Sequence, residues 1–201
     1  IYNYKSRVQV INTTDIGGYK GEDFIPNMAD NIKQYVKLSN SNVLSLFNSK
    51  KRLEDTYNIL ADDLYETNIN VYMNKKGIKC LKNAEDKSIV LGSKGFFEGV
   101  DVPGDGLVFV TLDKLPNLNP TDPLYFSIMT KFNKNYFDVN YPQMIIKVKQ
   151  ALGRLLRSKY DYGVFVLFNM GNSTYINKKL ENNLHGCIIT EANRNNIQRY
   201  I

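Results

Sequence analysis

The stretch VLSLFNSKKRLEDTYNILADDLY, residues 43–65, decides the fold class of this chain. Its first five residues, Val43–Phe47, form a compact apolar run of the kind found in buried strands. From residue 50 onward the apolar side chains recur at helical spacing instead, at Leu53, Tyr57, Leu60 and Leu64. A buried strand that leads through a short loop into a helix is the repeating unit of α/β proteins.

The rest of the sequence continues this alternation. Further strands are predicted at residues 8–11, 70–73, 88–91, 107–112, 163–168 and 187–190. Further helices are predicted at residues 24–36, 124–132, 142–157 and 174–182. Strands that alternate with helices predict a mostly parallel α/β sheet with helices on both faces. The sequence has no internal repeat and no low-complexity linker, so residues 1–201 are expected to form one domain.

The composition is that of a folded soluble protein, with 43% hydrophobic and 23% charged residues. No apolar run approaches the roughly 18 residues that span a bilayer, and nothing near Ile1 resembles a signal peptide. The net charge of +6 is compatible with a phosphate-rich partner. Because the sequence starts without Met, we expect it to be a piece of a longer chain.

Cysteine and histidine usage excludes several kinds of site. Cys80 and Cys187 are too few for a metal cluster or a disulfide framework, which favours a reducing, cytoplasmic setting. His185 is the only histidine, which argues against a histidine-based metal site or a catalytic triad.

Ligands of open α/β sheets gather beyond the carboxyl ends of the strands, and we expect three unusual segments to meet there. The first is LFNSKKR, residues 46–52. Ser49 and Lys50 stand at the start of a predicted helix, where free backbone amides attract anions. The alternative is that Asn48 or Ser49 only caps the helix and the basic side chains are solvated.

The second segment is GSKGFFEGVDVPG, residues 92–104, which has four glycines among 13 residues. Such density indicates special backbone conformations or close approach of a ligand. Glu98 and Asp101 could accept from ribose hydroxyls, hold a metal through water or pair with arginines. An ordinary turn with a structural aspartate remains the alternative.

The third segment is QALGRLLRSKYDYG, residues 150–163, which aligns Gln150, Arg154 and Arg157 on one stripe of a predicted helix. Guanidinium groups suit phosphate oxygens because their donors form a planar fork. A solvent-facing stripe of salt bridges is the alternative. Gly153, inside the predicted helix, favours close packing or a ligand, since glycine costs a helix about 1 kcal/mol relative to alanine.

Taken together and in order, these segments resemble the second motor domain of the DinG/XPD-like branch of superfamily 2 helicases. LFNSKKRLEDTY, residues 46–57, is similar to motif IV, residues 92–104 to motif V, and residues 150–163 to motif VI. DKLPNLNPTDPL, residues 113–124, resembles the signature that follows motif V in bacterial DinG proteins. The resemblance covers nearly the whole chain, and the four motifs in this order are specific.

The resemblance implies a RecA-like fold and an ATP site shared with a first motor domain of the same chain. Arg154 and Arg157 would then be arginine fingers on the γ-phosphate, and Gln150 would orient the phosphate or the attacking water. Gly99, Asp101 and Gly153 would lie on the nucleotide side. Mg²⁺ would be held mainly by the first motor domain, and an isolated second domain is expected not to hydrolyse ATP.

The resemblance also implies a single-stranded DNA partner and no membrane. The residues expected beside the strand are Ser49, Lys50, Gly95, Phe97 and Glu98. Phe97 stands where relatives often have Trp.

Some family features differ or lie elsewhere. Asn169-Met170-Gly171 replaces the usual Asp-x-Arg, which puts any contact from that pair in doubt. The sequence has no G-x-x-x-x-G-K-[ST] loop for the phosphates. The iron–sulfur cysteines of many relatives belong to the first motor domain, and nothing in this sequence replaces them.

The expected function is therefore that of the C-terminal motor domain of an ATP-dependent DNA helicase of the DinG family, and the resemblance favours movement from 5′ to 3′. Two alternatives stay open. Some bacterial DinG relatives carry an exonuclease domain, so the whole protein could be a 3′–5′ exonuclease. A RecA-like module that only grips nucleic acid is the other alternative, supported by the altered Asn169-Met170-Gly171.

Overall fold

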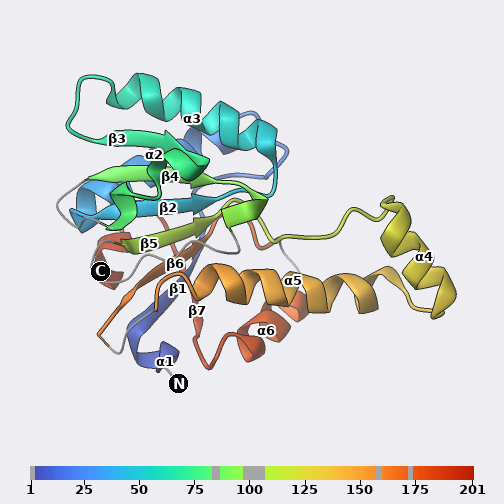
Figure 1. Ribbon diagram of the computed structural model, residues 1–201. Helices are drawn as coiled ribbons and strands as arrows, with labels where there is room; N and C mark the ends of the chain where they lie inside the picture. Colours follow the sequence, from blue (N-terminus) through green and yellow to red (C-terminus); the bar gives the residue numbers. More distant parts are fainter. Residues whose placement is uncertain (1–2, 83–86, 97–106, 157–159, 172–173) are drawn as a thin grey trace.

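The computed structural model describes residues 3–82, 87–96, 107–156, 160–171 and 174–201 (Figure 1). Seven strands form one sheet in the order β3-β4-β2-β5-β6-β1-β7. Every neighbouring pair of these strands is parallel, which confirms the predicted α/β class. The strands are β1 (Val8–Thr13), β2 (Asn42–Leu46), β3 (Asn70–Met73), β4 (Ser88–Gly92), β5 (Leu107–Leu112), β6 (Gly163–Leu167) and β7 (Ile189–Ala192).

Helices cover both faces of the sheet, as predicted (Figure 1). The α-helices are α1 (Tyr4–Arg7), α2 (Phe24–Ser39), α3 (Lys50–Leu64), α4 (Pro123–Lys131), α5 (Tyr136–Leu152) and α6 (Thr174–Asn183). Short 3₁₀ turns are η1 (Asn74–Gly77), η2 (Cys80–Lys82), η3 (Lys94–Phe96) and η4 (Ile197–Tyr200). Apolar residues of α2 and α3 pack on one face, and those of α5 and α6 pack on the other.

The central strands are buried on both faces. All six residues of β5 are buried, and the same holds for the five residues of β2, β4 and β6. Phe109 of β5 stacks on Tyr35 of α2 with ring centroids 4.8 Å apart. The Tyr35 hydroxyl donates to Oδ1 of Asn31 at 3.0 Å, so the polar end of this buried ring has a partner. Burial raises the pKa of Tyr35 far above its usual range.

Helix α5 differs from the prediction at both ends. It begins at Tyr136 rather than residue 142 because Asn135 and Asp138 form a capping box. It ends at Leu152 rather than residue 157. The amides of Arg154 and Leu155 donate to the carbonyls three residues earlier, at 3.1 Å each, so the chain tightens and leaves the α-helix.

Two other segments depart from simple expectations. The last strand begins at Ile189, two residues later than predicted, because His185 and Gly186 take positive φ values after α6. Helix α4 projects away from the sheet and has no buried residue (Figure 1). Its exposed side chains include Leu124 and Phe126, each 62% exposed.

The stacked rings identify a residue on which folding depends. Phe109→Ala is expected to lower the free energy of unfolding by about 3–5 kcal/mol, because it leaves a cavity between β5 and Tyr35. Phe126→Ala, on the exposed face of α4, removes the same side chain with little effect and serves as the control. Urea denaturation of both variants measures the difference. Equal losses in the two variants would contradict this role of the stacked rings.

Candidate functional site

The carboxyl ends of neighbouring strands bring several loops into one row. Residues 73, 91, 46, 112 and 167 are consecutive partners or near neighbours across β3, β4, β2, β5 and β6. Backbone hydrogen bonds continue beyond the strand ends, from the Phe47 amide to the Gly92 carbonyl at 2.8 Å and from the Asp113 amide to the Leu46 carbonyl at 3.0 Å. The loops that follow these strands therefore lie side by side along one edge, which we call the carboxyl edge.

Ser49 and Lys50 lie on the carboxyl edge, as the sequence predicts. Ser49 is the N-cap of α3, and its Oγ accepts from the Arg52 amide at 3.4 Å. Lys50 is 85% exposed, with Nζ 3.6 Å from the Glu54 carboxylate. The capping interpretation of Ser49 is therefore correct in this structure, and the adjacent ammonium group stays open to solvent. A cap and an exposed cation at a helix N-terminus are together compatible with a phosphate ligand.

A buried polar cluster under this edge was missed by sequence reasoning. The Asp113 side chain is fully buried and its Oδ1 accepts from the Asn48 amide at 3.0 Å and from Asn48 Nδ2 at 2.9 Å. Nη1 of Arg52 lies 3.7 Å from Asp113 Oδ2. The Arg52 guanidinium also lies over the Tyr19 ring, 4.5 Å from its centroid, and donates to the Tyr19 carbonyl at 3.3 Å. Arg52 thus acts as a structural cation, unlike the solvated Lys50.

The Asp113 cluster fixes the loop after β2 to the loop after β5. Burial raises the pKa of the Asp113 carboxyl, and the Asn48 donors and the nearby Arg52 offset only part of that effect. An aspartate that directly follows an apolar strand is a signal that could have indicated this position. Its partners could not be identified from sequence, since Asn48 and Arg52 lie more than sixty residues away along the chain.

Gly95 lies on the same edge, in the exposed turn η3 that follows β4. Phe96, the next residue, is buried against Gly92, where any side chain would clash with its ring. The remaining predicted residues of this segment lie outside the described part of the chain. They are Phe97, Glu98, Gly99 and Asp101.

The arginine segment lies at the opposite edge of the sheet, and the expectation that all three segments meet at the carboxyl edge was wrong. Helix α5 runs back antiparallel to the strands, so its end lies where β5 and β6 begin (Figure 1). A Cβ on Gly163 would lie 2.7 Å from Leu155 Cδ2 and 2.6 Å from the Val108 carbonyl, which places Leu155 at these strand starts. We call this edge, where the strands begin, the amino edge. Gln150 and Arg154 are half-buried there.

Gly153 does not interrupt a helix but caps it, with φ −63° and ψ −10°. A Cβ at this position would lie 3.2 Å from the Lys149 carbonyl and 3.9 Å from the Tyr4 hydroxyl oxygen. Tyr4 in turn stacks on His185, with ring centroids 4.7 Å apart. Close packing against α1 therefore accompanies this glycine. Arg157 lies outside the described residues, so its predicted stripe with Arg154 is not seen.

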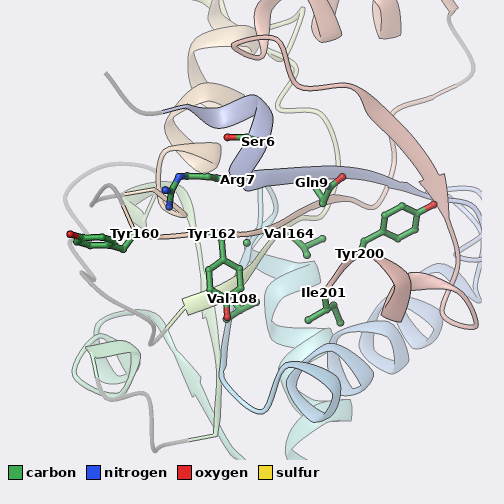
Figure 2. A pocket seen from close by; sticks show the side chains of 10 residues that line it. Ser6, Arg7, Gln9, Val108, Tyr160, Tyr162, Val164, Tyr200 and Ile201 are labelled. Atoms are coloured by element: carbon green, nitrogen blue, oxygen red, sulfur yellow. The ribbon is translucent and has the colours of Figure 1, made fainter.

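A pocket of about 420 Å³ opens beside the first residues of β1, β5 and β6 (Figure 2). Arg7, Gln9, Tyr160, Tyr162 and Tyr200 contribute polar groups to its wall. Nη1 of Arg7 donates to the Asp161 carbonyl at 3.3 Å, which joins α1 to the segment after the arginines. The amino edge thus carries cationic and hydroxyl groups. The sequence has no glycine-rich phosphate loop that could accompany them.

Asn169-Met170-Gly171 lies at the carboxyl end of β6, far from Arg154 along the strand direction. Met170 is buried, and the Asn169 carbonyl accepts from the Leu115 amide at 3.2 Å. This segment therefore packs against the DinG-type signature rather than presenting charged groups.

The described residues offer neither a metal centre nor a membrane span. Among them, no group of three or more His, Cys, Asp or Glu side chains is arranged to hold a metal ion. Within the same residues, no helix has the length and apolarity needed to cross a bilayer.

A parallel sheet of this order, with helices on both faces, has the RecA-like fold. The sequence matches the family described as the helicase C-terminal domain over residues 32–186, and the chain belongs to this family, in its DinG/XPD-like branch. It is 32% identical over 177 residues to the 3′-5′ exonuclease DinG of Staphylococcus epidermidis, covering 85% of this chain and 20% of that protein. The protein of the same name from Staphylococcus aureus strain MSSA476 is 29% identical over 174 residues, covering 82% of this chain and 19% of that protein. The chain thus spans about a fifth of the length of these relatives.

Solved structures agree on the fold. An XPD helicase superposes with a TM-score of 0.67 at 16% identity, covering 92% of this chain and 35% of that one. Xpd4 of S. tokodaii superposes with a TM-score of 0.65 at 17% identity, covering 92% of this chain and 38% of that one. S. cerevisiae Dbp5 bound to RNA and ADP BeF3 superposes with a TM-score of 0.63 at 13% identity, covering 98% of this chain and 45% of that one. These likenesses confirm the predicted RecA-like fold.

The buried Asp113 generates a prediction about pH. Its pKa is raised in the folded protein, so the folded state binds the proton more tightly than the unfolded chain does. The stability that the Asp113 carboxyl contributes is therefore fully present below its pKa in the unfolded chain. It is lost as pH rises through its higher pKa in the folded protein. The unfolding free energy of the wild type, minus that of Asp113→Asn, should fall as pH rises above about 4.

Urea denaturation of both proteins across that pH range measures this difference. The asparagine variant is the natural reference because it keeps the shape of the side chain and does not titrate. A difference that grows with pH would contradict the prediction and would indicate that the Arg52 cation outweighs the cost of burial.

Proposed function

We propose that residues 1–201 form the second motor domain of an ATP-dependent DNA helicase of the DinG family. The amino edge would face ATP held mainly by a first motor domain of the same chain, and the carboxyl edge would face single-stranded DNA. The observation that supports the proposal is that the described residues Gln150 and Arg154 lie at the opposite edge of the sheet from Ser49, Lys50 and Gly95, in a chain of the helicase C-terminal domain family.

On the nucleotide side, Arg154 and Arg157 are proposed to stabilise negative charge on the γ-phosphate, and Gln150 to orient the phosphate or the attacking water. Guanidinium and amide donors fit phosphate oxygens in kind. Gly99, Asp101 and Gly153 are proposed to line the same side. Mg²⁺ is proposed to be bound mainly by the first motor domain, together with the phosphates of ATP.

On the DNA side, the carboxyl edge offers exposed cations in a row. Lys75 and Lys76 follow β3, Lys50 and Lys51 follow β2, and each is exposed to solvent. Such a row matches the repeating charge of a nucleic-acid backbone. Ser49 and Gly95 lie within the row, and Phe97 and Glu98 are proposed to join it.

The arrangement suggests how the two sites are linked. Strands β2, β4, β5 and β6 run from one edge to the other and are fully buried, so a shift imposed on one edge moves the other with it. ATP binding would clamp the two motor domains together and hydrolysis would release them. A domain of this kind can convert that cycle into steps along a strand.

A second candidate is favoured by the names of the relatives, which are 3′-5′ exonucleases. The whole protein would then degrade DNA with a domain outside this chain, and the present domain would bind the strand. Incubating the full-length protein with an end-labelled partial duplex that carries single-stranded tails, with and without ATP, separates the two. Stepwise shortening from the 3′ end without ATP supports the nuclease, and ATP-dependent strand separation supports the motor. In either case we expect the protein to work in the cytoplasm.

The arginine assignment is tested in the full-length protein. Arg154→Ala should lower DNA-stimulated ATP turnover by up to about 10³- to 10⁵-fold, because an arginine finger stabilises charge that develops during phosphoryl transfer. Arg154→Lys should restore little, since an ammonium group cannot reproduce the planar fork.

Single-strand binding without nucleotide should persist in both variants, because the proposed DNA contacts lie at the other edge. Thermal melting of the same preparations is the control for folding. Unchanged turnover in the alanine variant, or a large fall in melting temperature that accounts for the lost turnover, would overturn the assignment.

The DNA edge is tested by charge reversal. Lys50→Glu combined with Lys51→Glu should weaken single-strand binding about equally for unrelated sequences, because phosphate contacts carry no sequence information. The slope of log affinity against log salt should shrink by about one for each lysine that no longer neutralises a phosphate. Lys37→Glu combined with Lys87→Glu, two exposed positions that precede β2 and β4 at the opposite edge, gives the same change in net charge. Equal weakening by the two pairs would contradict the proposed path.

A further inference from the structure

A cleft of about 640 Å³ lies at the outer end of the carboxyl edge, where the edge strand β3 stops. Its volume is within the range of about 300–1,000 Å³ that is usual for ligand pockets. Tyr57 of α3 forms one part of its wall, Tyr72 and Met73 of β3 another, and Gly95 a third. Three separate elements therefore enclose one space beside a predicted DNA-contacting residue.

The walls are mainly apolar and aromatic. Tyr57, Tyr72 and Met73 are each only partly buried, with Tyr57 and Met73 packed against the core under α3 and Tyr72 against the core on the other face of the sheet. Phe96, which is buried, also lines the cleft. The Tyr57 ring and the Met73 thioether suit a flat aromatic guest, because such a guest gains from stacking and from contact with sulfur.

The rim is basic. Lys75 and Lys76 lie in η1 and are exposed, and both line the cleft. Two cations above an apolar wall favour a ligand that is itself aromatic on one side and anionic on the other. An unpaired nucleotide has this combination of a flat base and a charged phosphate.

The cleft is held open by its own polar contacts. Asn74, at the base of the lysine turn, takes a left-handed conformation with φ 54°. Its Oδ1 accepts from the Ser93 amide and from the Ser93 hydroxyl, at 3.2 Å each. These bonds tie the lysine turn to the segment that leads into Gly95. The site is therefore preformed, which lowers the entropy lost when a ligand binds.

We propose that this cleft receives one unstacked base of the single strand, while Lys75 and Lys76 contact the flanking phosphates. The inference rests on the proposed DNA-binding function and extends it to a base-holding site at the end of the row that Lys50 begins. The strand would cross β2 and β4 along their carboxyl ends and place a base against Tyr57 and Met73. Holding a base by stacking is tolerant of sequence, because every base has an aromatic face.

The test compares a thymine oligonucleotide with one of the same length in which the central residues are abasic, both bound to the full-length protein. The wild type should bind the base-containing strand about 5- to 100-fold more tightly, as expected for stacking of a base on an aromatic side chain. Tyr57→Ala should reduce this preference, and Tyr57→Phe should retain it because the ring remains. Tyr72→Ala, whose ring packs on the other face of the sheet, is the matched control.

Gly95→Leu provides a variant that does not remove packing. A Cβ on Gly95 meets no atom within 4 Å, so the added side chain has room and would occupy the mouth of the cleft. It should lower the preference for the base-containing strand towards one. Lys75→Glu with Lys76→Glu should instead weaken both oligonucleotides alike, and the Lys37→Glu, Lys87→Glu pair is the matched control for charge.

The possible results distinguish failure of the base-holding site from failure of the proposed DNA binding. If both oligonucleotides bind and their ratio is unchanged in Tyr57→Ala and Gly95→Leu, the cleft does not hold a base, while DNA binding stands. An apolar peptide as the true occupant would give this same unchanged ratio. If the wild type binds neither oligonucleotide, the proposed function fails and the base site fails with it.

Discussion

Burial of the sheet on both faces is the constraint on which the rest of this structure depends. Strands β2, β4, β5 and β6 have no solvent-facing residue, because α2 and α3 cover one face and α5 and α6 the other. A parallel sheet needs this cover, since each crossover connection lays a helix on a face. Polar chemistry is therefore confined to the two edges, where the chain turns between strand and helix.

The two edges are chemically different because strands and helices end at different places. Strands end at the carboxyl edge and release loops that begin helices, so this edge collects helix N-termini such as that of α3, with its exposed Lys50. Helix α5 ends at the amino edge, so Gln150, Gly153 and Arg154 lie there. A nucleotide and a nucleic-acid strand could thus be bound by one small domain without competing for space.

The polar groups that are buried have a structural role. Asp113 and Arg52 lie under the carboxyl edge and join the loops after β2 and β5, with Asn48 supplying two hydrogen bonds to the carboxylate. Burying a charge is costly unless it is paired and hydrogen-bonded, and these contacts offset part of that cost. The cluster keeps the exposed lysines of α3 in a fixed relation to the signature segment, and this defines the edge more sharply than loops alone would.

The sequence by itself determined the class of fold and most of its elements. The apolar runs of β3 and β5 and the helical spacing of α3 depend on local pattern, and each was predicted within a residue or two. The motifs likewise indicated the family, because their order along the chain is a property of sequence. Ser49 and Lys50 could be placed on the carboxyl edge because they directly follow a predicted strand.

Only the tertiary structure decided where the arginine segment lies and what surrounds it. Helix α5 begins at a capping box, and its end depends on a tightened last turn and on the contact of Tyr4 with Gly153, none of which is visible in a periodic pattern. The pairing of Asp113 with Arg52 and the cleft beside Tyr57 and Met73 join residues that are distant in the chain. Such contacts follow from the strand order, and that order is set by how the two cores pack together rather than by any local stretch of sequence.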